Sequence, residues 1–305
     1  MRRLRLILVL ALLVGGALLA VVGHSDARVN LSSILALWSD AARDADQAGM
    51  KLTRLSDADE MRIGAELTRN SLWTSEDAAD SAYVTDIAQL LLPHVRRHGI
   101  RYTFRVVESP AINAFALPGG HVFVTTALLD FAESEAEVAA VLGHEISHVD
   151  LRHCVERYQY EYRLRKAGMP QAGFLVEFAH RLATIGFAPY QETEADLNGE
   201  RLAIDAGYDP DAAASLFQRM KTQFGEPAVR PATTPAGEVG HAVGQAIGSY
   251  FSTHPPSSER AQQLSEMVAQ NRRELKGRPF YVGRQNLKER VARARRQYQS
   301  ENREW

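Results

Sequence analysis

The chain contains the stretch His144-Glu145-Ile146-Ser147-His148, in which two histidines lie four residues apart and a glutamate follows the first. On an α-helix, residues four apart lie on one face, so the two imidazoles can reach a single metal ion. Glu145 stands beside them, where its carboxylate can take a proton from a metal-bound water. This pattern is typical of zinc hydrolases, and we expect one Zn²⁺ per chain, bound by His144 and His148.

The residues around this motif predict the helix that it requires. Ser134, followed three residues later by Glu137, forms a capping box, which satisfies free backbone N–H groups at a helix start. Apolar residues then recur at helical spacing from Val138 to Val149, and the helix is expected to be buried and to continue to about Lys166. The single cysteine, Cys154, is expected to be a small buried residue late in this helix rather than a reactive thiol. The alternative is a pair of core histidines with satisfied hydrogen bonds.

A zinc site needs a third protein ligand. The metzincin spacing is absent, because Leu151 and Cys154 stand where that pattern has Gly and His, and His153 is out of register. Further along, Glu192 and Asp196 are four residues apart and share a helix face. Glu192 can bind the metal, while Asp196 accepts a hydrogen bond from a ligand histidine and fixes its tautomer. A solvated acidic helix start is the alternative interpretation.

In combination, HExxH and the later Glu192-Thr193-Glu194-Ala195-Asp196 resemble the family of zinc endopeptidases that includes HtpX, the CAAX prenyl proteases, BepA and LoiP. The stretches INAFALPGG at 112–120 and THPPSSER at 253–260 agree with this family. The resemblance covers about residues 55 to 270. It implies an α+β fold: a mainly helical, zincin-like (gluzincin) metalloprotease domain with a small β-sheet beside the HExxH helix.

The resemblance also implies roles outside the HExxH helix. His254 and Arg260 would approach the metal site, where His254 could polarise the substrate carbonyl or cap the zinc in a resting form. A plain helix-capping role for His254 before Pro255 is the alternative. The substrate would add as a strand along the edge formed by Asn113, Ala114, Phe115 and Ala116, although an ordinary hairpin has the same sequence pattern.

Periodicity and turn residues predict the remaining elements. A helix from about Ser56 to Leu72 should be followed by another from Ser75 or Asp77 to near Gly99. Strands are expected at 102–107, 113–116 and 122–124, a short helix after 125, and helices at 172–187, 192–206 and 211–224, followed by a loop over 225–240 that is rich in Pro, Gly and Thr.

The two ends of the chain differ from the centre. Arg2, Arg3 and Arg5 precede an apolar run from Leu6 to Val22, so residues 1–23 are interpreted as a signal peptide or an N-terminal membrane anchor. Residues 24–55 would form a helical linker, residues 56–270 the zinc metallopeptidase domain, and residues 271–305 a basic C-terminal helical extension. That extension holds 11 Lys or Arg against 4 Asp or Glu. Its stripe of Leu287, Val291, Ala294 and Tyr298 would dock it, with weak contact to an anionic membrane as the alternative.

These observations lead to one main hypothesis and two alternatives. The protein would be exported and periplasmic, soluble or tethered by residues 1–23, and it would cleave peptide bonds of misfolded or unassembled cell-envelope proteins. The net charge of −2 gives no general attraction to nucleic acid. Alternatively, the protein is mainly an envelope assembly chaperone or adaptor whose zinc site is latent under His254. A zinc-stabilised structural domain is the third possibility, and it predicts four protein ligands with no open position.

Overall fold

The computed structural model describes residues 55–69, 76–166, 187–224, 254 and 258–304. The predicted signal or anchor segment and the predicted linker up to residue 54 lie outside these residues. So do the predicted helix at 172–187, except for Phe187, and the predicted loop at 225–240. Leu55–Trp305 forms one compact unit by its contacts.

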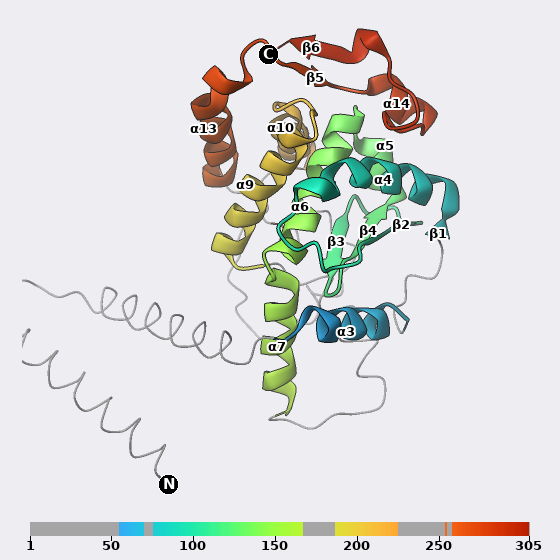
Figure 1. Ribbon diagram of the computed structural model, residues 1–305, viewed down its shortest axis with the longest axis vertical. Helices are drawn as coiled ribbons and strands as arrows, with labels where there is room; N and C mark the ends of the chain where they lie inside the picture. The colour runs from blue at the N-terminus through green and yellow to red at the C-terminus, as the bar shows by residue number, and fades with distance from the viewer. Residues whose placement is uncertain (1–54, 70–75, 167–186, 225–253, 255–257, 305) are drawn as a thin grey trace, which may run out of the picture. The chain divides into compact units, whose positions relative to one another are not determined.

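A four-stranded sheet lies beside helix α6 (Glu135–Asp150), which carries the HExxH motif (Figure 1). Its strands are β1 (Glu76–Asp77), β2 (Thr103–Val107), β3 (Ala114–Leu117) and β4 (His121–Thr125), in the order β1-β2-β4-β3. Strand β2 runs parallel to β4, whereas β3 pairs with β4 antiparallel. The three predicted strands are therefore present, and β3 is an edge strand.

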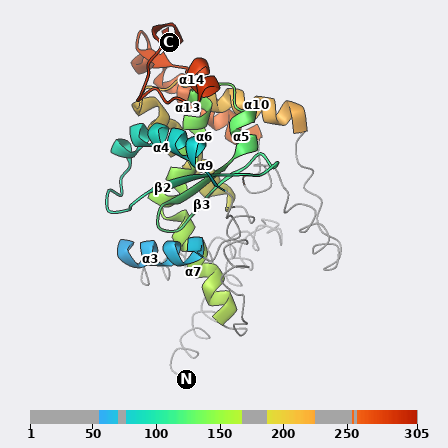
Figure 2. The same ribbon diagram turned by 90° about the vertical axis from the view of Figure 1, so that its right-hand side faces the viewer.

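Both faces of this sheet are buried, and the alternation of side chains along the strands decides which helix each residue contacts. Val106, Ala116 and Val124 belong to the main core, which lies against α4 (Ala78–Leu91) and α6 (Glu135–Asp150). Phe115 and Phe123 face the other way and join a second cluster with α3 (Asp57–Arg69) and α7 (His153–Lys166). Figure 2 shows these helices on opposite sides of the strands.

The predicted second helix ends earlier than expected. Asp77 caps α4 by accepting hydrogen bonds from the N–H groups of Ala79 and Asp80. The helix ends at Leu91, not near Gly99, and a short 3₁₀ turn over Leu92–His94 follows. Pro93 lies in the first positions of this turn, where its missing N–H costs nothing, but it cannot extend the α-helix.

Helix α6 carries the HExxH motif and is buried along its whole length. Ser134 caps it by accepting the Glu137 N–H, as predicted. The prediction of a full capping box is wrong, because the Glu137 carboxylate does not bond back to the N–H of Ser134. It accepts the N–H of Glu133 and pairs with Arg219 at 2.5 Å. The Arg219 guanidinium, which belongs to α10 (Ala212–Phe224), therefore holds this carboxylate in place of the Ser134 N–H.

The prediction that the metal helix continues to about Lys166 is also wrong. It ends at Asp150, and a second helix, α7, begins at His153. Arg152 lies between them with a φ of 71°, in the left-handed region, and its guanidinium pairs with Asp57 at 3.0 Å. The break places Cys154 in the first turn of α7, buried as expected, where burial raises the pKa of its thiol.

Four more helices complete the layer around α6. They are α5 (Thr126–Phe131), α9 (Pro189–Asp205), α10 and α13 (Ser258–Leu275). Helix α9 begins three residues before the predicted Glu192, with Pro189 in its first turn. Helices α6 and α9 approach closely at Gly143 and Gly199, whose backbones leave no room for a side chain between them.

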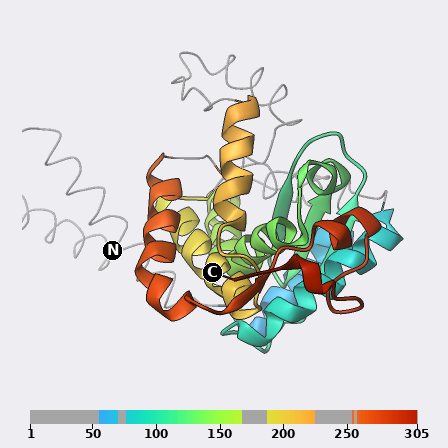
Figure 3. The same ribbon diagram turned by 90° about the horizontal axis from the view of Figure 1, so that it is seen from above.

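The C-terminal residues do not form the predicted basic helix. They contain strand β5 (Pro279–Tyr281), the short helix α14 (Arg284–Glu289) and strand β6 (Asn302–Glu304), which pairs with β5. In Figure 3 this segment runs over the ends of the central helices. Of the predicted stripe, Leu287 is buried but Ala294 is exposed. Four of its arginines instead contact acidic or carbonyl oxygens of the domain, namely Arg290, Arg293, Arg295 and Arg303, whereas Arg296 pairs with Glu289 of the same segment.

The fold is thus α+β and mainly helical, with a small sheet beside the HExxH helix, as predicted. In the part of the chain that the structure describes, no helix combines the length and the apolar character needed to cross a bilayer.

Candidate metal centre

Four buried side chains from three parts of the fold converge on one point. His144 and His148 come from α6, Glu192 from the first turn of α9, and His254 from the residues before α13. Their ligand atoms all lie within 4.8 Å of one another. The Nε2 atoms of the two helix histidines are 3.0 Å apart, and the Glu192 carboxylate lies 3.6 Å from His144 and 3.7 Å from His148.

The ring of His144 is held by Asp196. Its Nδ1 lies 2.9 Å from the Asp196 carboxylate, one helical turn after Glu192 on α9. If Nδ1 carries the ring proton, facing this carboxylate, then the Nε2 atom carries a lone pair and faces the other three groups. The structure thus brings Asp196 to His144, and its role as the partner of a metal-binding histidine stays a prediction.

His148 is held in the same manner by a residue that sequence reasoning did not assign. Its Nδ1 lies 3.1 Å from Nδ1 of His153, whose Nε2 lies 3.2 Å from the Glu194 carboxylate. If His153 gives its Nε2–H to Glu194, its Nδ1 accepts the Nδ1–H of His148, and Nε2 of His148 is again left with a lone pair. Burial lowers the pKa of His153 to about 4, so its ring is neutral at pH 7. The sequence signal was available: a histidine five residues after a ligand histidine.

These tautomers decide whether a cation fits the site. The Nε2 atoms of His144 and His148 cannot hydrogen-bond to each other when both carry lone pairs, yet they lie 3.0 Å apart in a buried place. A positive charge between them removes this repulsion. Two imidazoles and one carboxylate are a ligand set that Zn²⁺ accepts, so the donors fit that metal.

Arg260 connects the two carboxylates of α9. Its guanidinium lies 3.0 Å from Glu192 and makes a two-pronged ion pair with Asp196 at 2.6 and 2.8 Å. Burial would raise the pKa of Asp196, but Arg260 and His144 lower it to about 2. Burial would also raise the pKa of Glu192, and His254, His144 and Arg260 lower it. Both groups are therefore anionic at neutral pH, as a metal ligand and its hydrogen-bonding partner must be.

Glu145 lies in the same site without being part of the donor set. Its side chain is fully buried, and within the described residues neither carboxylate oxygen has a hydrogen-bond partner. Burial raises its pKa. Its nearest cationic neighbour is His254, with Nε2 at 3.3 Å. A carboxyl group of raised pKa beside a metal site is the arrangement expected of a general base.

His254 faces both carboxylates. Its Nδ1 is 3.0 Å from Glu192 and 3.1 Å from Nε2 of His144. Burial lowers its pKa, but the charges of Glu192 and Glu145 outweigh this effect and raise it. The structure brings His254 and Arg260 to Glu192, and His254 is one of the four residues that could hold a metal ion; the roles predicted for both residues stay predictions.

Strand β3 packs against helix α6, which carries two of these histidines, and Phe187 contacts His148. The Asn113 carbonyl accepts the N–H of Thr125 on β4, so by the alternation of an antiparallel ladder the backbone groups of Ala114 and Ala116 point away from β4. Cys154 already contacts the Ala116 carbonyl. Phe187 stacks on His148 with ring centroids 3.7 Å apart.

The comparison with known families accounts for this arrangement. The model of Peptidase family M48 matches residues 78–268, which is more than half of the chain and includes the HExxH helix, Glu192, Asp196 and Arg260. The chain belongs to peptidase family M48.

Curated relatives agree with the family. A segment of 204 residues is 30% identical to the mitochondrial metalloendopeptidase OMA1 of Schizosaccharomyces pombe, covering 63% of this chain and 55% of the relative. The Arabidopsis thaliana OMA1 is 27% identical over 75% of this chain and 46% of its own. The Beta-barrel assembly-enhancing protease of Escherichia coli K12 is 26% identical over 65% of this chain and 45% of its own. The chain thus spans about half the length of these relatives.

Proposed function

We propose that this chain is a zinc-dependent metalloendopeptidase. The observation that carries the proposal is the convergence of the Nε2 atoms of His144 and His148 with the Glu192 carboxylate, with Glu145 beside them and outside the donor set. His144, His148 and Glu192 would hold one Zn²⁺. Zinc, when bound, supplies a Lewis acid that brings the pKa of water to about 7 and polarises a carbonyl.

The residues of the chain would then carry the proton and hold the substrate. Glu145 takes the proton of the attacking water and passes it to the leaving amine. Asp196 and Arg260 keep His144 and Glu192 in place. An extended substrate would pair with the outward backbone groups of β3, above all at Ala114, and main-chain pairing of this kind is tolerant of sequence.

We further propose that the substrates are misfolded or unassembled envelope proteins and that the chain acts after export. The support is the basic and apolar character of residues 1–23 and the printed name of the E. coli relative, which refers to β-barrel assembly. The names of the OMA1 relatives refer to mitochondria, so relatives alone do not decide the compartment.

A latent form of the site is the second candidate, because His254 already occupies the position of a fourth ligand. In that form His254 excludes the substrate, and the protein would act as an assembly chaperone or adaptor until His254 moves. In the open form, the same ring could polarise the substrate carbonyl. A purely structural zinc site shares the four ligands but gives Glu145 no task.

One experiment tests these alternatives. Bound zinc and casein cleavage are measured together for the full chain, for Glu145→Gln and for His254→Ala. The peptidase proposal predicts that Glu145→Gln keeps its zinc and loses about 10²–10⁴-fold in rate, the usual contribution of a general base. Zinc-dependent cleavage that survives in Glu145→Gln would contradict this mechanism, and absence of zinc from every variant would contradict the site.

The His254→Ala variant separates the two roles of that residue. A latent site predicts faster cleavage by His254→Ala than by the wild type. A carbonyl-polarising role predicts slower cleavage with zinc retained. Equal rates would show that His254 has neither role.

A further inference from the structure

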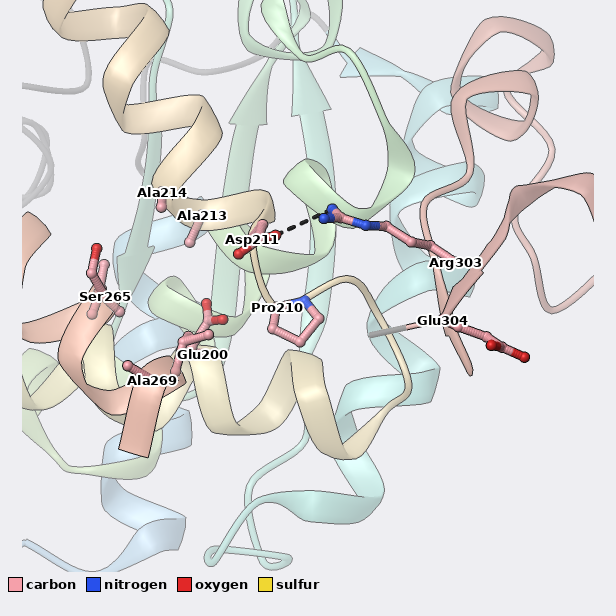
Figure 4. A pocket seen from close by; sticks show the side chains of 11 residues that line it. Glu200, Pro210, Asp211, Ala213, Ala214, Ser265, Ala269, Arg303 and Glu304 are labelled. Carbon is pink, nitrogen blue, oxygen red and sulfur yellow. Dashed lines mark ion pairs between the residues drawn. The ribbon is translucent and has the colours of Figure 1, made fainter. Parts of the chain in front are cut away.

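A second cavity lies on the far side of α9 from β3, between α9, α10, α13 and strand β6 (Figure 4). Its volume is about 430 Å³, within the range of small-molecule sites. Most of its wall is apolar, with contributions from Pro210, Ala213, Leu264 and Val268. One ionisable group in this wall, Glu200, is buried.

The described part of the chain offers Glu200 no hydrogen-bond or ion-pair partner to explain its burial. Its side chain is only 4% exposed, and among the residues that the structure describes no hydrogen bond or ion pair reaches its Oε1 atom. Burial raises its pKa, and the negative charges of Asp196, Asp209 and Asp211 raise it further. A carboxyl group in this position lacks a compensating cation, and leaving it unpaired costs stability.

The cations nearest to the cavity are already engaged. Arg303 at the rim pairs with Asp211 and Asp209 at 3.2 Å each, and Figure 4 shows its guanidinium directed at Asp211 and not at Glu200. The same view shows the Glu304 side chain pointing away from the cavity. Among the described residues, the wall of the cavity therefore contains one buried carboxyl group without a cationic partner, that of Glu200, and the neighbouring acids surround it with negative charge.

We propose that this cavity binds a guanidinium group on an aliphatic chain, with the Glu200 carboxylate as its partner. The apolar walls suit the methylene stem, and a guanidinium is planar, weakly hydrated and able to bond both carboxylate oxygens at once. A metal ion fits poorly, because it would find one carboxylate where it needs several ligands. The ligand is an arginine side chain of a protein segment or a free arginine-like compound.

This site would lie close to the metal centre without being part of it. Glu192, Asp196 and Glu200 are spaced four residues apart along one face of α9, so Glu200 is about 12 Å along the helix axis from Glu192. A smaller cavity between them is lined by His144, Asp196 and Glu200. The inference stands on Glu200 and its cavity alone and goes beyond the proposed peptidase activity.

Ligand-observed NMR titration of the full, metal-loaded chain tests the inference. The probes are Nα-acetyl-arginine amide, the uncharged Nα-acetyl-norleucine amide, and the capped tripeptide Ala-Arg-Ala. We expect saturable binding of the arginine probe and none of norleucine. Glu200→Gln should bind arginine about 10- to 100-fold more weakly, as expected from the loss of a charge-assisted hydrogen bond, whereas Glu266→Gln, an exposed control outside the cavity on α13, should bind normally.

A second variant keeps the carboxyl group and fills the space. Ala269 is exposed and lines the cavity, so Ala269→Trp should block binding without disturbing the core. If the tripeptide binds more tightly than the arginine amide, the ligand is an arginine of a protein segment. If the tripeptide binds equally or more weakly, the ligand is a free arginine-like compound. The inference is overturned if no probe saturates, if norleucine binds as well as arginine, or if Glu200→Gln binds as the wild type does.

Discussion

Helices α6 and α9, which carry the candidate metal ligands, touch at Gly143 and Gly199. A single methyl group on either glycine should disturb the metal centre. A Cβ atom on Gly143 would lie 2.6 Å from the Gly199 carbonyl oxygen, and one on Gly199 would lie 2.6 Å from the His144 backbone nitrogen. Both obstacles are backbone atoms, so no side chain can turn aside. Gly143→Ala and Gly199→Ala therefore have to move α6 and α9 apart.

The size of this movement sets the expected effect on the metal. Reaching 3.0 Å, below which Cβ contacts are essentially never found, requires about 0.4 Å of separation, and ordinary contact requires about 0.8 Å. Metal–ligand distances tolerate only about 0.2 Å. Because His144 and His148 lie on one helix and Glu192 on the other, we expect zinc affinity to fall at least about tenfold.

The free energy of unfolding should also fall in these variants, although replacing Gly by Ala inside a helix usually raises it. Replacing Gly by Ala inside a helix normally stabilises it by about 0.5–1 kcal/mol, whereas overpacking costs about 1–3 kcal/mol. A net loss of up to about 2.5 kcal/mol follows for Gly143→Ala, measured by chemical denaturation of the metal-free protein. Zinc affinity is measured by competition with a chromogenic chelator.

A matched control separates loss of stability from loss of the site. Gly277→Ala introduces the same methyl group at a φ of 75° with no atom within 4 Å, so it adds backbone strain of about 1 kcal/mol far from the metal centre. It should lower stability and leave zinc affinity unchanged. If Gly143→Ala and Gly199→Ala bind zinc as tightly as the wild type, the close approach of the two helices does not position the ligands and the reasoning fails.

Three further outcomes follow from buried contacts. His153→Ala should weaken zinc binding about 10- to 100-fold in chelator competition, and an unchanged affinity would show that His148 needs no support from it. Arg260→Met should destabilise the metal-free protein by about 3–5 kcal/mol in denaturant titrations, because Glu192 and Asp196 keep buried charges without their partner; a loss below 1 kcal/mol would refute this. The pKa of His121 is lowered to about 4 by burial, so the unfolded chain takes up a proton near pH 6.5 that the folded protein refuses until about pH 4. His121 should therefore lower the stability of the metal-free protein by about 2–3 kcal/mol as the pH drops through that window, and His121→Gln should remove this share while leaving the share of His153, whose pKa is also lowered to about 4.

The sequence was sufficient for the metal centre wherever the signal lay within one helix. His144 and His148 are four residues apart, as are Glu192 and Asp196, and helical spacing alone predicts that each pair shares a face. The meeting of the two pairs was predicted only through the need for a third ligand and the family resemblance. His153 was missed because it lies beyond the break at Arg152, and this break depends on a partner about a hundred residues earlier, Asp57.

The C-terminal segment shows why a regular pattern of residue types is not enough. Leu287 and Val291 have helical spacing, yet the chain turns at Arg290, which has a φ of 52° and pairs with Asp80 and Asp130. Long-range ion pairs and the pairing of β5 with β6 outweigh the weak preference of a thin apolar stripe for a helix. Part of the positive charge of this segment, which in the sequence resembles a membrane-binding surface, is directed at acids of its own domain through Arg290, Arg295 and Arg303.

Helix α9 combines three carboxyl groups whose surroundings give them different states. Glu192 and Asp196 are kept anionic by Arg260 and the histidines, which suits metal binding, whereas Glu200, one turn further on, has no cation and a raised pKa. The spacing of the three residues is identical, so sequence alone gives them equivalent roles. Their difference arises from α13, which brings Arg260 to the first two and an apolar wall to the third. The position of α13 on α9 therefore determines both the ligand set of the metal centre and the unpaired carboxyl group of the second cavity.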